Sequence, residues 1–153
     1  MKYKSFFLIF LLLFMVFSVI CYATEDEYKF PVEVINATGE RDSSILSNIF
    51  VYEIKEIIRN SNTMRLSSEN EPKIIIQIQT LPRFEEDPEI SIIYSAVYLF
   101  YLNNLTTPYY YDSSLGFCGR DVYKESAKNI VVILDNLIEE LKISYQDNIK
   151  KGV

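Results

Sequence analysis

The chain has 153 residues with 21 acidic side chains, 15 basic side chains and no histidine, and its formal net charge at neutral pH is −6. This acidic balance argues against a nucleic-acid partner, because the affinity for nucleic acid comes mainly from neutralised phosphates. The lack of histidine excludes Ser-His-Asp and Cys-His catalysis. With so few cysteines it also excludes the usual zinc and copper sites, and we expect no cofactor.

Residues 1–23 have the pattern of an export signal. A short basic start precedes an apolar run over residues 6–20, and Cys21-Tyr22-Ala23 offers small residues for cleavage. The apolar run is shorter than the roughly 20 residues of a membrane-spanning helix. We therefore predict cleavage after Ala23 and a mature protein in the bacterial periplasm or outside the cell.

Two alternatives to a cleaved signal stay open. In the first alternative the segment is not cleaved and anchors the protein in the membrane. In the second the protein is a lipoprotein, and Cys21 is its acylated residue. Ile20 departs from the small residue that a lipoprotein signal has before its cysteine. After cleavage, Cys118 would be the single cysteine, which excludes an internal disulfide. Residues 24–149 suffice for one domain, and residues 150–153 are expected to fray.

The first half of the mature chain predicts a strand and a helix. Residues 28–35 alternate between apolar and polar, and Pro31 indicates an edge strand or a position near a strand start. Asp42 or Ser43 is expected to cap an amphipathic helix that runs to about Asn60. Residues 64–66 form a short extended piece within a polar stretch.

Two long β-rich runs, residues 73–81 and 91–102, predict a hairpin. In the first run Ile74, Ile76 and Ile78 share one face. The second run is apolar on both faces, which is typical of a central strand or of a strand whose outer face is covered.

A candidate third strand of this meander is Tyr109-Tyr110-Tyr111, followed by a glycine-bearing connection over residues 112–119. The last helix is expected to begin near Asp121 and carries an apolar stripe to Leu141. The order β-α-β-β-(β)-α predicts an α+β fold, in which a mostly antiparallel sheet of three to four strands has two helices packed on one face.

This order of elements over residues 28–141 is similar to that of small periplasmic domains. Examples are the N-terminal domain of the Tol-system propeller protein and the domain of the curli secretion lipoprotein. The likeness rests on the order of elements and on no motif. It therefore implies an α+β fold and no particular function.

Four acidic residues, Glu85, Glu86, Asp87 and Glu89, cluster in the hairpin turn. Carboxylates of this kind can bind Ca²⁺ or act as acid and base on glycosides. The spacing of a calcium loop is missing, however, and consecutive acids on a loop point different ways. We expect a solvated turn that blunts an exposed sheet edge.

Cys118 is a candidate reactive thiol. It lies just before a predicted helix start and two residues from Arg120, and both features would lower the pKa of a thiol. No histidine is present to act as its base. A buried core thiol is therefore the favoured interpretation, and a reactive or partner-bonded thiol is the alternative.

Tyrosine is concentrated in the meander, where six of the 12 tyrosines lie between positions 94 and 111. Strand propensity and core packing explain such enrichment, but tyrosine is also common where a surface binds a partner. Two helices can cover only one face of the sheet. Tyr101, Tyr109, Tyr110 and Tyr111 are therefore candidate binding residues near the rim of an uncovered face.

These patterns predict a small exported accessory or binding module of the cell envelope that is not an enzyme. Its partner would be another protein or a second copy, reached through the sheet face. The alternatives are a small secreted hydrolase that uses only Asp or Glu, and a secreted effector or inhibitor that occludes its partner. Asn36 and Asn104 begin glycosylation sequons, which matter only in a eukaryotic secretory pathway.

Overall fold

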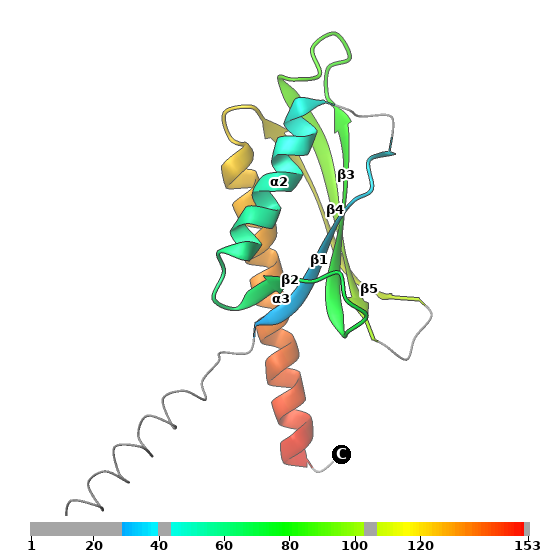
Figure 1. Cartoon of the computed structure of the whole chain (residues 1–153), viewed down its shortest axis with the longest axis vertical. Helices are drawn as coiled ribbons and strands as arrows, with labels where there is room; N and C mark the ends of the chain where they lie inside the picture. Colours follow the sequence, from blue (N-terminus) through cyan, green and yellow to red (C-terminus); the bar gives the residue numbers. More distant parts are fainter. Residues whose placement is uncertain (1–28, 40–43, 103–106, 152–153) are drawn as a thin grey trace, which may run out of the picture.

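The structure is a computed structural model that describes residues 29–39, 44–102 and 107–151. Five strands form one sheet, and both helices lie against the same face of it (Figure 1). The expected export signal and its cleavage site lie outside the described residues. The elements in chain order are β1 (Phe30–Asn36), α2 (Ile45–Arg59), β2 (Met64–Leu66), β3 (Lys73–Pro82), β4 (Ser91–Tyr101), β5 (Tyr109–Gly119) and α3 (Tyr123–Lys151).

The α+β class is confirmed, but the sheet is larger and more mixed than we expected. Its strand order is β2-β1-β3-β4-β5. Strand β1 runs parallel to both β2 and β3, whereas β3, β4 and β5 form an antiparallel meander. The prediction of a mostly antiparallel sheet of three to four strands is therefore wrong in the number of strands and in the direction of β1.

Strand β1 is internal, although it contains Pro31. The backbone N–H of Phe30 donates to the Thr63 carbonyl on the β2 side at 2.8 Å. Alternation along the strand then points the nitrogen of Pro31 toward β3, just before the paired register with β3 begins at Val32. The missing N–H of Pro31 therefore removes no bond from the ladder, which is why proline is tolerated at this position.

Strand β5 extends over the whole stretch that we expected to be partly a connection. Its register to β4 shifts at Tyr111, which forms a bulge, and it is regular from Asp112 onward. Gly116 faces the ring of Tyr94, where an added Cβ would lie 2.5 Å from the hydroxyl oxygen. Glycine at this position therefore lets β5 lie close to the Tyr94 ring.

The start of α2 is bound from two directions. Ser44, rather than Asp42 or Ser43, is its N-cap, and the Ser44 side chain accepts a hydrogen bond from Ser47 N at 3.2 Å. The carboxylate of Glu89 accepts from the backbone N–H groups of Ile45 and Leu46 at 2.8 and 2.9 Å. A carboxylate at this end also interacts favourably with the positive pole of the helix dipole.

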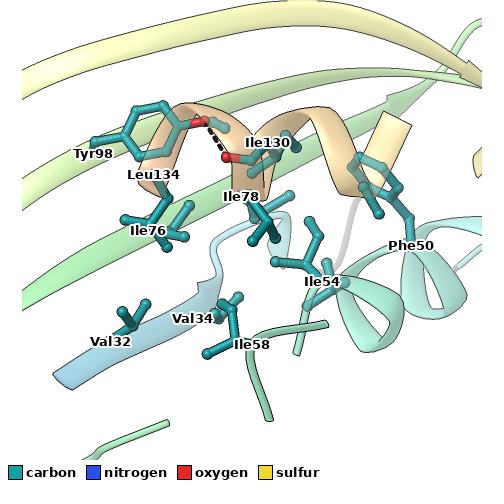
Figure 2. Packing of buried hydrophobic residues seen from close by; sticks show 14 of the residues in the cluster. Val32, Val34, Phe50, Ile54, Ile58, Ile76, Ile78, Tyr98, Ile130 and Leu134 are labelled. Atoms are coloured by element: carbon teal, nitrogen blue, oxygen red, sulfur yellow. Dashed lines mark hydrogen bonds between the residues drawn. The ribbon is translucent and has the colours of Figure 1, made fainter. Parts of the chain in front are cut away.

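The hydrophobic core lies between the sheet and the two helices (Figure 2). As predicted, Ile74, Ile76 and Ile78 of β3 share the face that is buried under the helices. Tyr98 of β4 is fully buried there, and its hydroxyl donates to the Ile130 carbonyl of α3 at 3.3 Å. Burial raises the pKa of Tyr98 to about 12. The tyrosine hydroxyl thus joins β4 to α3 without a buried charge.

Candidate interaction surface

The sheet face opposite the helices is the candidate functional surface, and we call it the outer face. Odd-numbered residues of β3 and β4 lie on it, and their register with β5 adds Tyr110, Leu115 and Phe117. No described helix or strand packs against it (Figure 1). Its residues are Glu33, Ile35, Lys73, Ile75, Gln77, Gln79, Leu81, Ile93, Ser95, Val97, Leu99, Tyr101, Tyr110, Ser113, Leu115 and Phe117.

In the middle of the outer face the exposure of apolar side chains increases toward β5, while Leu81 at the end of β3 is itself 52% exposed. Ile75 in β3 is 8% exposed, and Val97 and Leu99 in β4 are half-buried. Leu115 and Phe117 in β5 are 78% and 66% exposed. A strand inside a sheet has its side chains shielded from both sides, whereas β5 has only β4 beside it among the described strands. The most accessible apolar surface therefore lies along the edge strand.

One end of the outer face is closed by a polar cluster around Lys73. Its ammonium group lies 2.7 Å from the Glu33 carboxylate and 5.7 Å from the ring centroid of Tyr101. The Tyr101 hydroxyl in turn donates to the side-chain oxygen of Asn70. Tyr101 is therefore half-buried and held within its own chain, and it borders the apolar part of the face.

The opposite end carries a cation between two rings. The guanidinium carbon of Arg83 lies 5.2 Å from the ring centroids of both Phe84 and Phe117. Arg83 and Phe84 follow β3, and Phe117 comes from β5, so the contact connects the hairpin turn to the edge strand. Sequence reasoning missed this cluster, because the ring of Phe117 is separated from Arg83 by the whole of β4.

The three consecutive tyrosines point to different surroundings. Tyr110 is on the outer face opposite Leu99, and Tyr109 is paired with Phe100 on the other face. Tyr111 is the bulge residue, and its hydroxyl donates to Glu140 of α3 at 3.1 Å. Their side chains are 58%, 64% and 41% exposed in chain order. Of the three, the register therefore places only Tyr110 on the outer face.

Cys118 is a buried thiol on the helix side of β5. Its side chain has no exposed area, and it packs in the main hydrophobic cluster. Burial raises the pKa of Cys118 to about 11, which is opposite to the direction that its place near Arg120 suggested. The thiol is therefore protonated at neutral pH, when it is a weak nucleophile.

The acidic hairpin turn divides into two parts. Glu85, Glu86 and Asp87 are exposed, as a solvated turn would be, whereas Glu89 binds the start of α2. The sequence holds no local sign of this role, because Glu89 and Ile45 are 44 positions apart. Among the described residues, no group of three or more acidic or cysteine side chains is placed to hold a metal ion.

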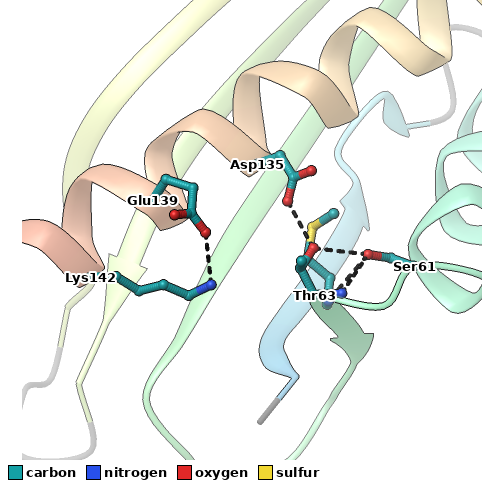
Figure 3. A network of polar contacts seen from close by, with 6 residues as sticks. Ser61, Thr63, Asp135, Glu139 and Lys142 are labelled. Carbon is teal, nitrogen blue, oxygen red and sulfur yellow. Dashed lines mark hydrogen bonds and ion pairs between the residues drawn. The ribbon is translucent and has the colours of Figure 1, made fainter. Parts of the chain in front are cut away.

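A groove of about 450 Å³ runs between α2 and α3 and contains further carboxylates. Asp135 accepts a hydrogen bond from the Thr63 hydroxyl at 2.8 Å, in a network that also includes Ser61 (Figure 3). Glu56 forms an ion pair with Arg59 along α2. Asp135 therefore connects α3 to the segment before β2, whereas Glu56 is paired within its own helix, and the two carboxylates do not share a partner.

No protein-family model matches this chain, and no curated protein matches it in sequence. The residues that the structure describes contain no helix that is both long and apolar enough to span a membrane. Conclusions about function therefore depend on the geometry of the outer face and on the sequence pattern of residues 1–23.

Proposed function

We propose that this protein is a small exported binding module of the cell envelope, which is not an enzyme and contacts a protein partner through its outer face. The observation that carries this proposal is the apolar surface around Val97, Leu115 and Phe117, which no described element covers. Monomeric proteins rarely leave large contiguous apolar patches in water, and such patches often mark interaction sites. The aromatic and aliphatic composition is also that of an interface core.

The placement of the acidic side chains supports a binding role over a hydrolase role. A hydrolase that relied on Asp or Glu would need carboxylates that converge in a pocket with shifted pKa values. Glu89 binds a helix start, Asp135 accepts from Thr63, and Glu56 pairs with Arg59. Glu71 has a lowered pKa, caused first by its hydrogen bond from Ser67, and a lowered pKa suits a permanent anion more than a proton donor.

Photo-crosslinking in the cells that naturally produce the protein tests this proposal. A photoreactive amino acid at Val97 would sit in the middle of the outer face, and one at the partly exposed Val132 of α3 would sit in the groove beside α2, away from the outer face, as a control. We expect discrete crosslinked species from Val97 and none of the same mass from Val132. No crosslink from Val97, or the same species from both positions, would contradict a partner-binding outer face.

Export is tested separately by the intact mass of the protein released from these cells. Cleavage after Ala23 would give a mature protein that begins at Thr24. A mass that matches the full chain would indicate an uncleaved anchor. A mass increased by a diacylglycerol group on Cys21 would indicate a lipoprotein.

A further inference from the structure

We propose that two copies of this chain pair through β5, antiparallel about a two-fold axis at Gly116, and so form one continuous sheet. This inference deepens the proposed function, since β5 borders the outer face, and it depends on that function for its biological meaning. It names one occupant of the edge, a second copy of this chain.

The edge of β5 has little of the protection that natural sheets use against strand pairing. Its partner on one side is β4, and no described strand lies on its other side. Asp112 is the single charged residue between Tyr109 and Gly119, and the strand contains no lysine and no proline. Charges, prolines and bulges are the usual protection of an edge. The bulge at Tyr111 leaves residues 112–119 regular.

The backbone groups that face outward from β5 follow from its register with β4. The N–H of Arg120 donates to the Ile90 carbonyl at 3.1 Å, and Gly119 is opposite Ser91. In an antiparallel ladder, alternate residues bond to the same neighbour. Even-numbered residues of β5 therefore bond to β4, and the groups that point away from it belong to Ser113, Leu115, Phe117 and Gly119. Two of these groups are bonded within the chain, because the Ser113 N–H donates to Asp112 Oδ1 at 2.7 Å and the Gly119 carbonyl accepts from the Val122 N–H at 3.1 Å. The backbone groups of Leu115 and Phe117 are therefore the central ones for a second strand.

A two-fold axis at Gly116 centres the pairing on Leu115 and Phe117 and avoids the bulge. Leu115 of one copy is then opposite Phe117 of the second copy, and Ser113 is opposite Gly119. Each of these pairs occurs twice by symmetry. The Leu115–Phe117 pair has the geometry that exchanges two hydrogen bonds, whereas in the Ser113–Gly119 pair the Gly119 N–H can donate to the Ser113 carbonyl. Moving the axis to Leu115 would place the bulge residue Tyr111 opposite Gly119 and interrupt the ladder.

Charge favours the same arrangement. With the axis at Gly116, Asp112 is opposite Arg120 of the second copy, and both side chains are exposed. Oδ1 of Asp112 accepts from the Ser113 N–H at 2.7 Å, and a carboxylate has a second oxygen that can accept from Arg120. The Nε of Arg120 donates to the Glu89 carbonyl at 3.1 Å, and the guanidinium carries further donors that can reach a carboxylate. A parallel pairing in register would instead place Asp112 beside its own copy, and like charges at that position are unfavourable.

The pairing would also bury part of the exposed apolar surface of the outer face. Leu115 and Phe117 are 78% and 66% exposed, and each would acquire the other as a cross-strand neighbour. Both pairs lie on the outer face, so the two outer faces become one continuous surface. The second copy thereby supplies the neighbouring strand that β5 lacks.

Charge exchange across the proposed axis is the decisive experiment. Protein purified from cells that express the full chain is analysed by sedimentation velocity across the micromolar range. We expect a concentration-dependent dimer for the unsubstituted protein. Asp112→Arg and Arg120→Asp should each raise the dimer dissociation constant by about tenfold or more, since each change turns two attractive pairs into two repulsive ones. The double variant should recover most of the lost association.

The recovery separates pairing from damage to the fold. Arg120→Asp removes the contact of Arg120 with Glu89 within one chain, so the melting temperature of each variant is measured beside its sedimentation. A double variant that stays as weak as the single variants would contradict the register. So would a wild-type protein that stays monomeric, or an association that no change in β5 affects.

Disulfide trapping gives an independent measure of the register. Leu115→Cys and Phe117→Cys proteins are mixed and oxidised, with the unsubstituted chain as the control for Cys118. Directly opposite residues are within disulfide reach, whereas residues offset by two positions are not. We expect the mixture to form a covalent dimer faster than either variant alone, and equal rates would contradict the axis at Gly116. A monomeric protein whose Val97 still crosslinks to a different protein would overturn this pairing and leave the proposed function intact.

Discussion

The two faces of the sheet are built from the same strands, yet they differ in what covers them. On the inner face Ile76 and Tyr98 are fully buried beneath α2 and α3. On the outer face their neighbours Gln77 and Val97 are partly exposed, and Leu115 is 78% exposed. Apolar character alone therefore does not decide burial in this domain. The face on which a residue falls, set by the alternation of the strand, and its distance from the edge strand decide it together, since Ile75 on the outer face of β3 is only 8% exposed.

Tyrosine shows the same contrast within two adjacent strands. Tyr98 is enclosed by the core, its hydroxyl donates to the Ile130 carbonyl, and burial raises its pKa to about 12. Tyr110 lies on the outer face with most of its ring exposed. The first residue stabilises the fold, whereas the second is available to a partner. The folded domain thus leaves part of its aromatic surface unused for folding.

The largest difference between the two faces is expected when a charged residue is placed on each face of β3. Ile76→Asp would bury an unpaired carboxylate, and we expect it to lower the free energy of unfolding by about 4 kcal/mol or more. Gln79→Asp, on the exposed outer face of the same strand, should change it by less than about 0.5 kcal/mol. Denaturant unfolding measures both. Equal losses would mean that the outer face is packed in the folded protein.

A smaller effect is expected where β5 crosses the Tyr94 ring. Gly116→Ala adds a Cβ that would lie 2.5 Å from the Tyr94 hydroxyl oxygen, and the overlap should cost about 1–3 kcal/mol of stability. At Gly119 the nearest atom to an added Cβ is 3.7 Å away, so Gly119→Ala is the matched control and should be nearly silent. In a Tyr94→Leu background the cost of Gly116→Ala should shrink. An unchanged cost in that background would mean that the stability loss of Gly116→Ala does not come from overlap with the Tyr94 ring.

The attachment of the helix layer to the hairpin turn provides a third comparison. Glu89→Ala removes the carboxylate that accepts from Ile45 and Leu46, and we expect a loss of about 1–2 kcal/mol in thermal or denaturant unfolding. Glu86→Ala, in the exposed part of the same turn, serves as the control and should have no measurable effect. Similar losses of stability from both variants would mean that the acidic residues of the turn act through their total charge.

The smallest effect concerns Cys118 and alkaline pH. Its pKa is raised from 9.0 to about 11, so the folded state holds the thiol proton more tightly than the unfolded state. The resulting stability is fully present below pH 9.0 and is lost as the pH rises toward about 11. Between pH 8 and 10, wild type should lose up to about 1 kcal/mol more stability than Cys118→Ala. A relative gain by wild type would indicate a stabilised thiolate.

Sequence patterns predicted the secondary structure correctly where buried residues recur at regular spacing along the chain. The alternation of Ile74, Ile76 and Ile78 indicated the inner face of β3, and the apolar stripe of α2 indicated a helix that packs against the sheet. These signals work because one buried face imposes a period of two on strands and about 3.6 on helices. The absence of histidine excluded whole classes of catalysis without any structure.

The tertiary structure alone decided the internal place of β1, the length of β5 and the role of Glu89. Strand β1 is parallel to strands that follow it much later, and β2 has only three residues, too few for a pattern. In β5 the inner positions Ser114 and Gly116 are small because Tyr98 and Tyr94 occupy the space above them. Pairings between distant segments produce no periodic pattern in the sequence. The residue type at each such position depends on a contact with a residue that is far away in the sequence and becomes a neighbour only in the folded chain.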